Sequence, residues 1–449
     1  MESILPFIRR NWAMSYPETP AKSQDALRIG LLGASTIAPI AVIGPAKSHP
    51  DVIIAAVAAR DEKRANAYAK QHGIPIVHSS YQGQFVLADL TSPSLSYSQG
   101  ERMQALSNHS NHTIELIDDP SIDAIYIPLP NGLHYEWALK ALRANKHVLL
   151  EKPSVSNASE AASLFRSPLL SQPDAPILLE AFHARFHPAC AAFLEHVDKE
   201  NVVSAHTTLT CPRYVFPETD IRFDFGIGGG VTMDMGAYTT LFLRLIFGTE
   251  PEECLEAIPR LMPKGFDQRC DQAMTAKWRF PNGGIGTMYV DLSLHGWGPI
   301  PGFRWPSCEV VHGETVVRDE SLGETSENEH VVVKKVIIWN MVMPVVWHRI
   351  DIVEQHTIRK SDDKKPLKTW ATTQYQKAYT WQDEVRKGQG HESWSTYRHQ
   401  LEQFVHRIKG RGSPSGVWID GEDSVKQMEM IDSAYKKAGL PLRPTSSYQ

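Results

Sequence analysis

Short apolar runs alternate with helical patterns over the first third of the chain. Four of these runs have the length and the Val, Ile, Leu and Ala content of buried strands. Helical spacing follows the first run, and residues 60–73 and 135–145 also have helical patterns. Strands that alternate with helices predict a doubly wound parallel sheet, a Rossmann-type α/β domain over residues 27–153. The four runs lie at residues 27–33, 52–58, 124–128 and 147–150.

Beyond residue 175 the pattern changes to strands with long connections. This pattern predicts an α+β domain over residues 154–449, built on a large, mostly antiparallel open sheet. Helical patterns at 232–247, 395–408 and 424–438 enter it, and we expect the C-terminal helices to pack back on the domain. The expected strands lie at residues 177–182, 202–210, 273–280 and 284–294 and in the strand-rich region 329–358.

Two segments fit neither domain pattern. Residues 1–26 are polar and contain proline, so we expect a poorly ordered N-terminal arm or one that docks on a partner subunit. Residues 82–113 are rich in Ser, Asn, Gln and His with little periodicity, which predicts an inserted, largely exposed loop. That loop is either a lid or a decoration.

Composition excludes several classes of partner. Lys and Arg number 46 against 51 Asp and Glu, a net charge of −5, and neither sign forms a long run. We therefore expect a small-molecule substrate and neither a nucleic acid nor a membrane as partner. Five widely separated cysteines fit reduced thiols in the cytoplasm better than a disulfide framework. No stretch reaches the roughly 18 apolar residues that a membrane span needs.

The turn after the first strand carries a partial dinucleotide-binding pattern. The segment Gly33-Ala-Ser35-Thr36-Ile37-Ala38 fits G-x-G-x-x-[GA], with serine at the second glycine position. Gly33 allows the tight turn, Ala38 allows close packing of helix on strand, and the helix N-terminus offers N–H donors to a pyrophosphate. Taken alone the pattern also fits a plain strand–helix turn, but the strands around it favour a dinucleotide site.

The end of the second strand bears on the choice of cofactor. Enzymes that prefer NAD usually place a carboxylate here for the ribose 2′-hydroxyl, whereas this strand runs into Arg60, with Arg64 nearby. A guanidinium suits a 2′-phosphate, so the sequence favours NADP. NAD stays possible because Asp61 can take the carboxylate role, and the basic residues also fit an exposed helix start.

Two further strand ends belong to the same edge of the predicted sheet. Pro130 and Asn131 follow one of them and predict a stiff wall beside a nicotinamide. His134 fits either a proton carrier or a structural, hydrogen-bonded histidine. The tripeptide Glu151-Lys152-Pro follows the other strand and places a lysine where α/β sheets bind ligands.

Asp234 and Tyr238 form the second informative site. On a helix they are i and i+4 neighbours on one face. An ammonium near the phenol, such as that of Lys152, lowers the phenol's pKa and makes a relay for the proton that moves during hydride transfer. An ordinary Asp–Tyr contact is the alternative.

Residues 180–187 contain a carboxylate and two histidines four apart, a spacing that can chelate zinc on a helix. The segment lacks the HExxH pattern and follows a strand, so we expect no metal. Arg185 within it is either a cation that orients substrate or a structural ion-pair partner.

Together these residues resemble the Gfo/Idh/MocA oxidoreductase family, and most closely its D-xylose dehydrogenase and dimeric dihydrodiol dehydrogenase branch. The resemblance implies hydride exchange between NAD(P) and a sugar, cyclic diol or related compound, in a homodimer that pairs through the C-terminal sheet. It implies that Lys152 touches both nicotinamide and the reacting oxygen, Tyr238 is the general acid/base and Asp234 orients the pair. It also matches Arg185 to an active-site arginine. The segments that carry the resemblance are 29–38, 127–134, 151–153, 180–188, 229–238 and 397–441.

Three departures from the family pattern stand out: Ser35, the 82–113 insertion and the long, Trp-rich region 297–395. The last of these can remodel a substrate pocket. Two other functions stay open: a regulator that senses NAD(P) without catalysis, and a glycosidase that uses bound NAD as a transient hydride store.

Overall fold

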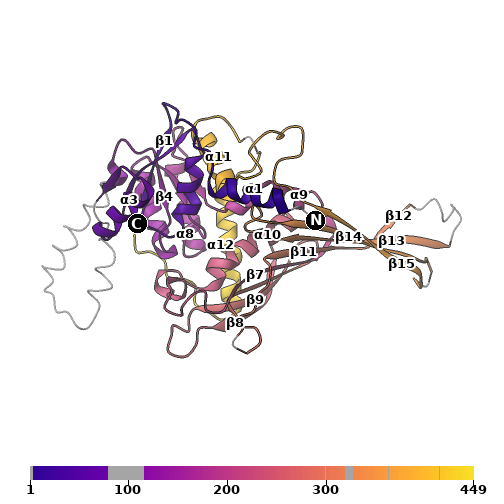
Figure 1. The fold of residues 1–449 in the computed structure, drawn as a ribbon. Coiled ribbons are helices and arrows are strands. Elements are labelled where there is room, and N and C mark those ends of the chain that lie inside the picture. Colours follow the sequence, from indigo (N-terminus) through magenta and orange to yellow (C-terminus); the bar gives the residue numbers. More distant parts are fainter. Residues whose placement is uncertain are drawn as a thin grey trace. The chain divides into compact units, whose positions relative to one another are not determined.

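The computed structural model describes residues 4–78, 116–298, 300–318, 327–362, 364–413 and 415–448 (Figure 1). The chain divides into two compact units. The parallel-sheet unit comprises Trp12–His183, Tyr397–Val425 and Thr445–Gln449. The mixed-sheet unit comprises Met1–Asn11, Ala184–Thr396 and Lys426–Pro444.

Six parallel strands form the first sheet, in the order β3-β2-β1-β4-β5-β6. The order reverses between β1 and β4, the kind of position at which open α/β sheets bind ligands. The four strands predicted for this domain are therefore confirmed, together with the parallel sheet. The strands are β1 (Leu27–Leu32), β2 (Val52–Ala58), β3 (Ile76–His78), β4 (Ala124–Ile127), β5 (His147–Leu150) and β6 (Leu178–Glu180).

The sixth strand corrects one expectation. The run at 177–182 was expected in the antiparallel sheet of the second domain, but β6 pairs in parallel with β5. A three-residue buried strand carries no periodicity that distinguishes one sheet from another, so its partner is decided by tertiary contacts.

Helices connect the parallel strands as predicted, with one difference. The turn after β1 leads into a five-residue π-helix, η1, before a short α-helix. The helix after β2 begins at its N-cap Asp61 and ends at Gly73, whose φ of +68° suits glycine. The helical segments are η1 (Pro39–Ile43), α2 (Gly44–Lys47), α3 (Glu62–His72), η2 (Asn131–Leu133), α7 (His134–Arg143), α8 (Ala158–Phe165), η3 (Pro168–Leu170) and α11 (Thr396–Ile408).

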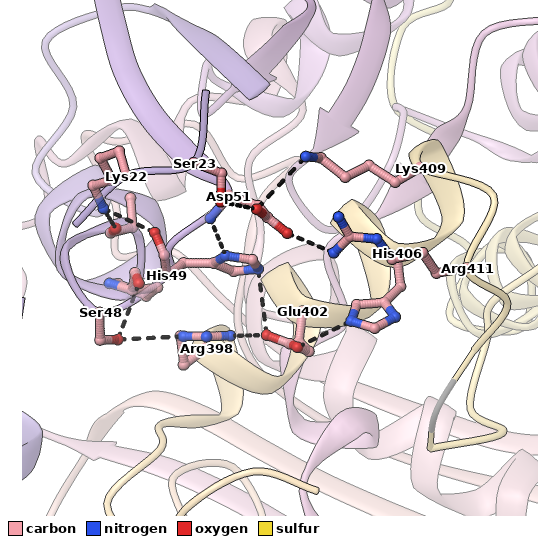
Figure 2. Close-up of polar contacts among 12 residues, drawn as sticks. Lys22, Ser23, Ser48, His49, Asp51, Arg398, Glu402, His406, Lys409 and Arg411 are labelled. Atoms are coloured by element: carbon pink, nitrogen blue, oxygen red, sulfur yellow. Dashed lines mark hydrogen bonds and ion pairs between the residues drawn. The ribbon is translucent and has the colours of Figure 1, made fainter. Parts of the chain in front are cut away.

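A polar cluster binds α11 to the end of α2 (Figure 2). His49, which is 2% exposed, lies 3.3 Å from Glu402 of α11, and Glu402 also accepts a hydrogen bond from Arg398. Asp51 pairs with Arg411, just beyond α11. Burial lowers the pKa of His49 to about 2, so its imidazole is neutral, and its Nδ1 accepts a hydrogen bond from the Asp51 amide at 3.1 Å.

Nine strands of the described residues form the second sheet, in the order β15-β14-β13-β11-β7-β10-β9-β8, with β12 paired to β13. Among the strands of this sheet that the structure describes, only β7 and β10 pair in parallel, which confirms the mostly antiparallel sheet. Figure 1 shows β13, β14 and β15 reaching beyond their shorter neighbours. The strands are β7 (Val202–Pro212), β8 (Glu253–Leu261), β9 (Asp271–Arg279), β10 (Ile285–Leu294), β11 (Ser307–His312), β12 (Thr315–Val317), β13 (Asn328–Trp339), β14 (Arg349–Lys360) and β15 (Pro366–Gln376).

One face of this sheet is covered by α10, which packs against β7 and β10. Helix α12 adds to the core, because Trp278 of β9 donates to Ser433 at 2.8 Å and Gln427 donates to the Ala237 carbonyl at 2.8 Å. The remaining helical segments are η4 (His183–Phe186), α9 (Pro188–Leu194), η5 (Lys199–Asn201), η6 (Ile221–Phe223), η7 (Phe225–Ile227), η8 (Thr232–Gly236), α10 (Ala237–Phe247) and α12 (Gly421–Lys437).

The N-terminal segment is a helix, α1 (Ile4–Ser15), so the expectation of a poorly ordered arm is wrong, while docking on a partner subunit stays a prediction. Arg10 is buried, donates to the Val345 carbonyl at 3.0 Å, and stacks 3.5 Å above the ring of Tyr379. Short helices gain most of their stability from such tertiary contacts, and the sequence pattern does not reveal them.

The insertion predicted at 82–113 lies outside the described residues. Among the helices that the structure describes, none combines the length and the apolar character needed to cross a bilayer.

Candidate active site

The turn after β1 is built for close approach of a ligand to its backbone. Gly33 has a φ of +103°, a conformation that favours glycine, and its N–H donates to the Ala58 carbonyl at 2.7 Å. Ser35 accepts a hydrogen bond from the Ala38 amide at 3.2 Å, so it caps the start of the helical segment. A serine oxygen that accepts this bond can still donate its own hydrogen to a phosphate oxygen.

Side chains of α3 hold this turn from the side. Arg64 donates to the Ala34 carbonyl at 2.9 Å, and Tyr68 donates to the Ser35 carbonyl at 3.0 Å. Burial raises the pKa of Tyr68 to about 12, which keeps its phenol a neutral donor. The turn is therefore fixed before any ligand binds.

The charges at the end of β2 are arranged as the NADP hypothesis requires. Asp61 accepts the Arg64 amide at 3.0 Å as the N-cap of α3. One oxygen of its carboxylate is therefore engaged by the helix, while Arg60 beside it is exposed. The side chains that can meet a ribose substituent here are mainly basic.

His134, the first residue of α7, is fully buried and has a structural environment. One ring nitrogen lies 2.9 Å from the Pro153 carbonyl and the other 2.7 Å from the Leu129 carbonyl. Burial lowers its pKa to about 4, while the two carbonyl oxygens oppose this shift because they favour the protonated ring. His134 thus links the loop that carries Pro130 and Asn131 to the turn that carries Lys152.

Two buried carboxyl groups hold the Lys152 turn. Glu151 accepts a hydrogen bond from the fully buried Tyr126 at 2.6 Å, and its other oxygen accepts the Lys152 amide at 3.3 Å. Glu180, paired with Leu150 across β5 and β6, accepts the Ser154 amide at 2.8 Å. Burial raises the pKa of Glu180 to about 7.

These loops follow β1, β2, β4 and β5, so they share the carboxyl edge of the parallel sheet. The edge offers a glycine turn at a helix start, guanidinium groups and a lysine held from both sides. Such a set suits a long, anionic ligand. The predicted residues 33–38, 60, 64, 130–134 and 151–152 are therefore brought together in one unit.

In the mixed-sheet unit, Asp234 lies on the π-helix η8 and Tyr238 on the first turn of α10. Short π-helical segments are frequent at functional sites. Tyr238 is 7% exposed, whereas the side chain of Asp234 is 25% exposed. The helix predicted over 232–247 is therefore confirmed, with a wider first turn than an α-helix has.

Arg222 is a site residue that the sequence analysis missed. Its guanidinium donates to Asp234 at 3.0 Å and to Asp220 at 3.0 Å, and it stacks 4.2 Å from the ring of Phe216. Asp234 therefore presents a charge that is already paired with a cation. Arg222 lies on the three-residue 3-10 helix η6, which is too short to leave a repeating pattern in the sequence.

Arg185 lies on η4 and is half-buried. No group of three or more metal-ligating side chains occurs in the part of the chain that the structure describes. Lys152 and Tyr238 belong to different units, so their joint action remains a proposal.

Comparison with known proteins places both units in one family. A family model described as an oxidoreductase family with an NAD-binding Rossmann fold matches residues 27–167. A second model, of the Gfo/Idh/MocA C-terminal domain, matches residues 201–314.

Individual relatives are dehydrogenases and reductases. The chain is 34% identical to D-xylose 1-dehydrogenase (NADP+) 2 of Haloferax volcanii over 50% of its own length and 58% of that protein, which is less than two thirds of the relative. It is 30% identical to an uncharacterized oxidoreductase of Rhizobium meliloti over 60% of its length and 70% of that protein. It is 26% identical to mouse trans-1,2-dihydrobenzene-1,2-diol dehydrogenase, over 60% and 69% of the two chains.

Solved structures show the same fold at low sequence identity. A 3-ketoreductase from Actinomadura kijaniata, crystallised with NADP and TDP-benzene, superposes with a TM-score of 0.62 at 20% identity, covering 92% of this chain and 98% of that chain. An aldose–aldose oxidoreductase from Caulobacter crescentus gives a TM-score of 0.60 at 17% identity, with the same coverage of both chains.

Proposed function

Because the chain belongs to the Gfo/Idh/MocA oxidoreductase family, we propose that it transfers hydride between NADP and a carbinol or carbonyl carbon of a sugar, cyclic diol or related small molecule. The observation that carries the proposal is the Lys152 turn. Its backbone is held by Glu151 on one side and Glu180 on the other, at the ligand-binding edge of the parallel sheet. A lysine held in this way serves a ligand at that edge.

The residues around the first turn fit NADP. The Gly33 turn and the helix start behind it would hold the pyrophosphate, while Arg60 and Arg64 would meet the 2′-phosphate. Support comes from Asp61, whose carboxylate is engaged as the N-cap of α3. The Haloferax volcanii relative is named for the same cofactor, NADP+. When bound, the nicotinamide supplies the hydride acceptor or donor.

The chain's own residues move the proton. We assign to Tyr238 the phenol that takes the proton from a substrate hydroxyl during oxidation, or returns it to a carbonyl oxygen during reduction. Lys152 places an ammonium at the same oxygen, where its charge favours the ionised phenol. Asp234, held by Arg222, orients the start of the helix that carries Tyr238.

The substrate class follows from the relatives and from the charged side chains. The relatives include dehydrogenases named for a sugar, D-xylose, and for a cyclic diol, trans-1,2-dihydrobenzene-1,2-diol. Arg185, half-buried on η4, supplies a hydrogen-bond donor for a hydroxyl next to the reacting carbon. The reaction needs no metal in this scheme, since Tyr238 transfers the proton and Lys152 stabilises the negative charge on the oxygen.

A substrate panel followed by NADPH absorbance tests this function. We expect turnover with at least one aldose or cyclic diol in the presence of NADP+, and an NADPH fluorescence change on binding. Binding of NADPH without turnover across aldoses, diols and ketones would instead favour a cofactor-sensing regulator. Glycoside cleavage without net consumption of cofactor would favour the hydride-store glycosidase.

We further propose that two copies pair through the nine-stranded sheet. Exposed apolar side chains on its strands support the pairing, among them Val203 at 55% and Ile258 at 57% exposed. Sedimentation of the wild type and of a Val203→Glu, Ile258→Glu variant tests it, since the charges should shift a dimer toward monomer.

A further inference from the structure

The segment that leads into η8 is packed directly on a buried ion pair. Gly230 has a φ of +128°, and a Cβ at this position would lie 2.1 Å from Arg443 and 2.3 Å from Asp271. At Gly229 a Cβ would lie 2.6 Å from the Asp224 carbonyl. The glycines of this turn are therefore required because two charged side chains and the backbone occupy the space.

Asp271, at the start of β9, is fully buried and accepts four hydrogen bonds. One carboxylate oxygen accepts the Thr232 amide at 2.9 Å and the Thr232 hydroxyl at 2.5 Å. The other accepts Tyr435 at 3.0 Å and Arg443 at 2.8 Å. Every acceptor direction of the carboxylate is used, so its position fixes Thr232, the first residue of η8.

Arg443, near the C-terminus, completes the arrangement from the other side. Its Nε donates to the Gly229 carbonyl at 2.7 Å, and its guanidinium stacks 3.7 Å from the ring of Tyr435. Neither Arg443 nor Asp271 has an exposed side chain. The planar fork of a guanidinium can reach a carboxylate and a carbonyl together, which a lysine ammonium cannot do with the same geometry.

The fixed turn is linked to the site residues by backbone hydrogen bonds. The Gly230 amide donates to the Arg222 carbonyl at 2.6 Å, and the Gly230 carbonyl accepts the Asp234 amide at 3.1 Å. The Arg222 guanidinium then returns to the Asp234 carboxylate. A shift of Gly230 would therefore move Asp234 and the start of the helix that carries Tyr238.

We infer that Asp271 and Arg443 are positioning residues for the reaction, setting the turn from which Asp234 and Tyr238 project. The inference rests on the proposed function. A buried ion pair adds little stability compared with apolar packing of the same volume, so its value here is the geometry that it imposes. The pair acts through the backbone of residues 229–232 and touches no substrate.

The test compares Arg443→Lys with a control and with two milder variants. Arg359→Lys is the control, because Arg359 also pairs with carboxylates, is 12% exposed and lies in the same unit on β14. Thr232→Val removes one hydrogen bond to Asp271 and keeps the ion pair, so we expect it to fold even if Arg443→Lys does not. Thr232→Ser keeps the hydroxyl and should restore the wild-type behaviour.

Two readouts are measured on each full-length variant. Hydrogen exchange of peptides covering residues 229–238 reports the turn without needing activity, and kcat and KM report the reaction with the substrate found in the panel. We expect Arg443→Lys and Thr232→Val to speed exchange in these peptides and to lower kcat by roughly 10- to 100-fold, with KM for NADP+ within about twofold of the wild type. Arg359→Lys should change neither readout.

Unchanged exchange in these peptides would overturn the inference, as would faster exchange with an unchanged kcat. A change in KM for NADP+ as large as the change in kcat would indicate a general loosening of the protein and would also count against the inference. A wild type that binds NADP(H) but turns over no substrate would refute the proposed function. The inference on Asp271 and Arg443 is refuted separately, by variants that behave as above in a background where the wild type is active.

Discussion

The guanidinium of Arg222 donates to the carboxylate of Asp234 at 3.0 Å. This contact links η6 to the helical segment that leads into the helix of Tyr238, and it gives Asp234 a paired charge. Asp220 shares the same guanidinium at 3.0 Å. Arg222 therefore controls the orientation of Asp234 without being visible as a motif.

Replacing Arg222 should impair the reaction more than binding. Arg222→Met leaves Asp234 without its cation, and we expect kcat to fall by roughly 10- to 100-fold because the carboxylate loses a charge-assisted hydrogen bond. Arg222→Lys keeps the charge and should retain part of the activity. Steady-state kinetics of both variants check this, and equal activity of Arg222→Met and the wild type would contradict it.

The choice of NADP over NAD is predicted to depend on Arg60. The variant Arg60→Ala removes one guanidinium that would contact the 2′-phosphate. It should raise KM for NADP+ by roughly tenfold or more and leave KM for NAD+ nearly unchanged. Lys63→Ala is the matched control, since Lys63 is an exposed cation in the first turn of the same helix, α3. An equal rise in KM for NADP+ in both variants would instead indicate nonspecific attraction between the cofactor and positive charge.

Glu180 is predicted to make stability depend on pH. Burial raises its pKa in the folded protein to about 7, from 4.5 in the unfolded chain, with Asp423 adding repulsion. Between these values the folded state binds the extra proton, so the free energy of unfolding falls as pH rises from 4.5 to about 7. Its contribution is fully present below the lower pKa and is lost above the higher one.

Glu180→Gln removes this titration and keeps the oxygen that accepts the Ser154 amide. Relative to the wild type, the variant should gain about 3 kcal/mol in unfolding free energy over this pH interval. Urea denaturation at several pH values measures the difference. A difference between the two proteins that does not change with pH would show that Glu180 does not titrate in this range.

The cluster in Figure 2 predicts unequal costs for two ion pairs of the parallel-sheet unit. Glu402→Ala leaves the 5% exposed Arg398 without its carboxylate and should cost about 3 kcal/mol of stability. Glu422→Ala breaks a surface pair with Arg166, whose side chain is 54% exposed, and should cost less than about 1 kcal/mol. Thermal or urea unfolding compares the two variants. Similar losses of stability would contradict the idea that the buried pair of Arg398 and Glu402 matters more than the surface pair.

The parallel sheet and its ligand-binding edge followed directly from the sequence. Strand and helix periodicities are local, so the runs ending at Leu32, Ala58, Ile127 and Leu150 were recognisable one by one. The motif residues Gly33 and Lys152 stand at strand ends, and the topology of a parallel sheet then brings them to one edge.

Other features depend on contacts that no local pattern contains. The helix at Ile4–Ser15 is held by Arg10, which contacts a residue more than 300 positions away. The strand β6 belongs to the parallel sheet because it pairs with β5. Asp271 and Arg443 are 172 positions apart and form their pair only in the fold. Buried polar networks of this kind form between residues that are distant in the sequence, so local sequence patterns do not predict them.

The proton relay of Lys152 and Tyr238 is tested most directly by single-turnover hydride transfer, followed by NADPH absorbance with saturating cofactor and substrate. We expect Tyr238→Phe and Lys152→Met each to slow this step by roughly 10²- to 10⁴-fold, because each removes a group that moves or stabilises the proton. Binding of NADPH should survive in Tyr238→Phe. Hydride transfer at the wild-type rate in either variant would contradict the relay.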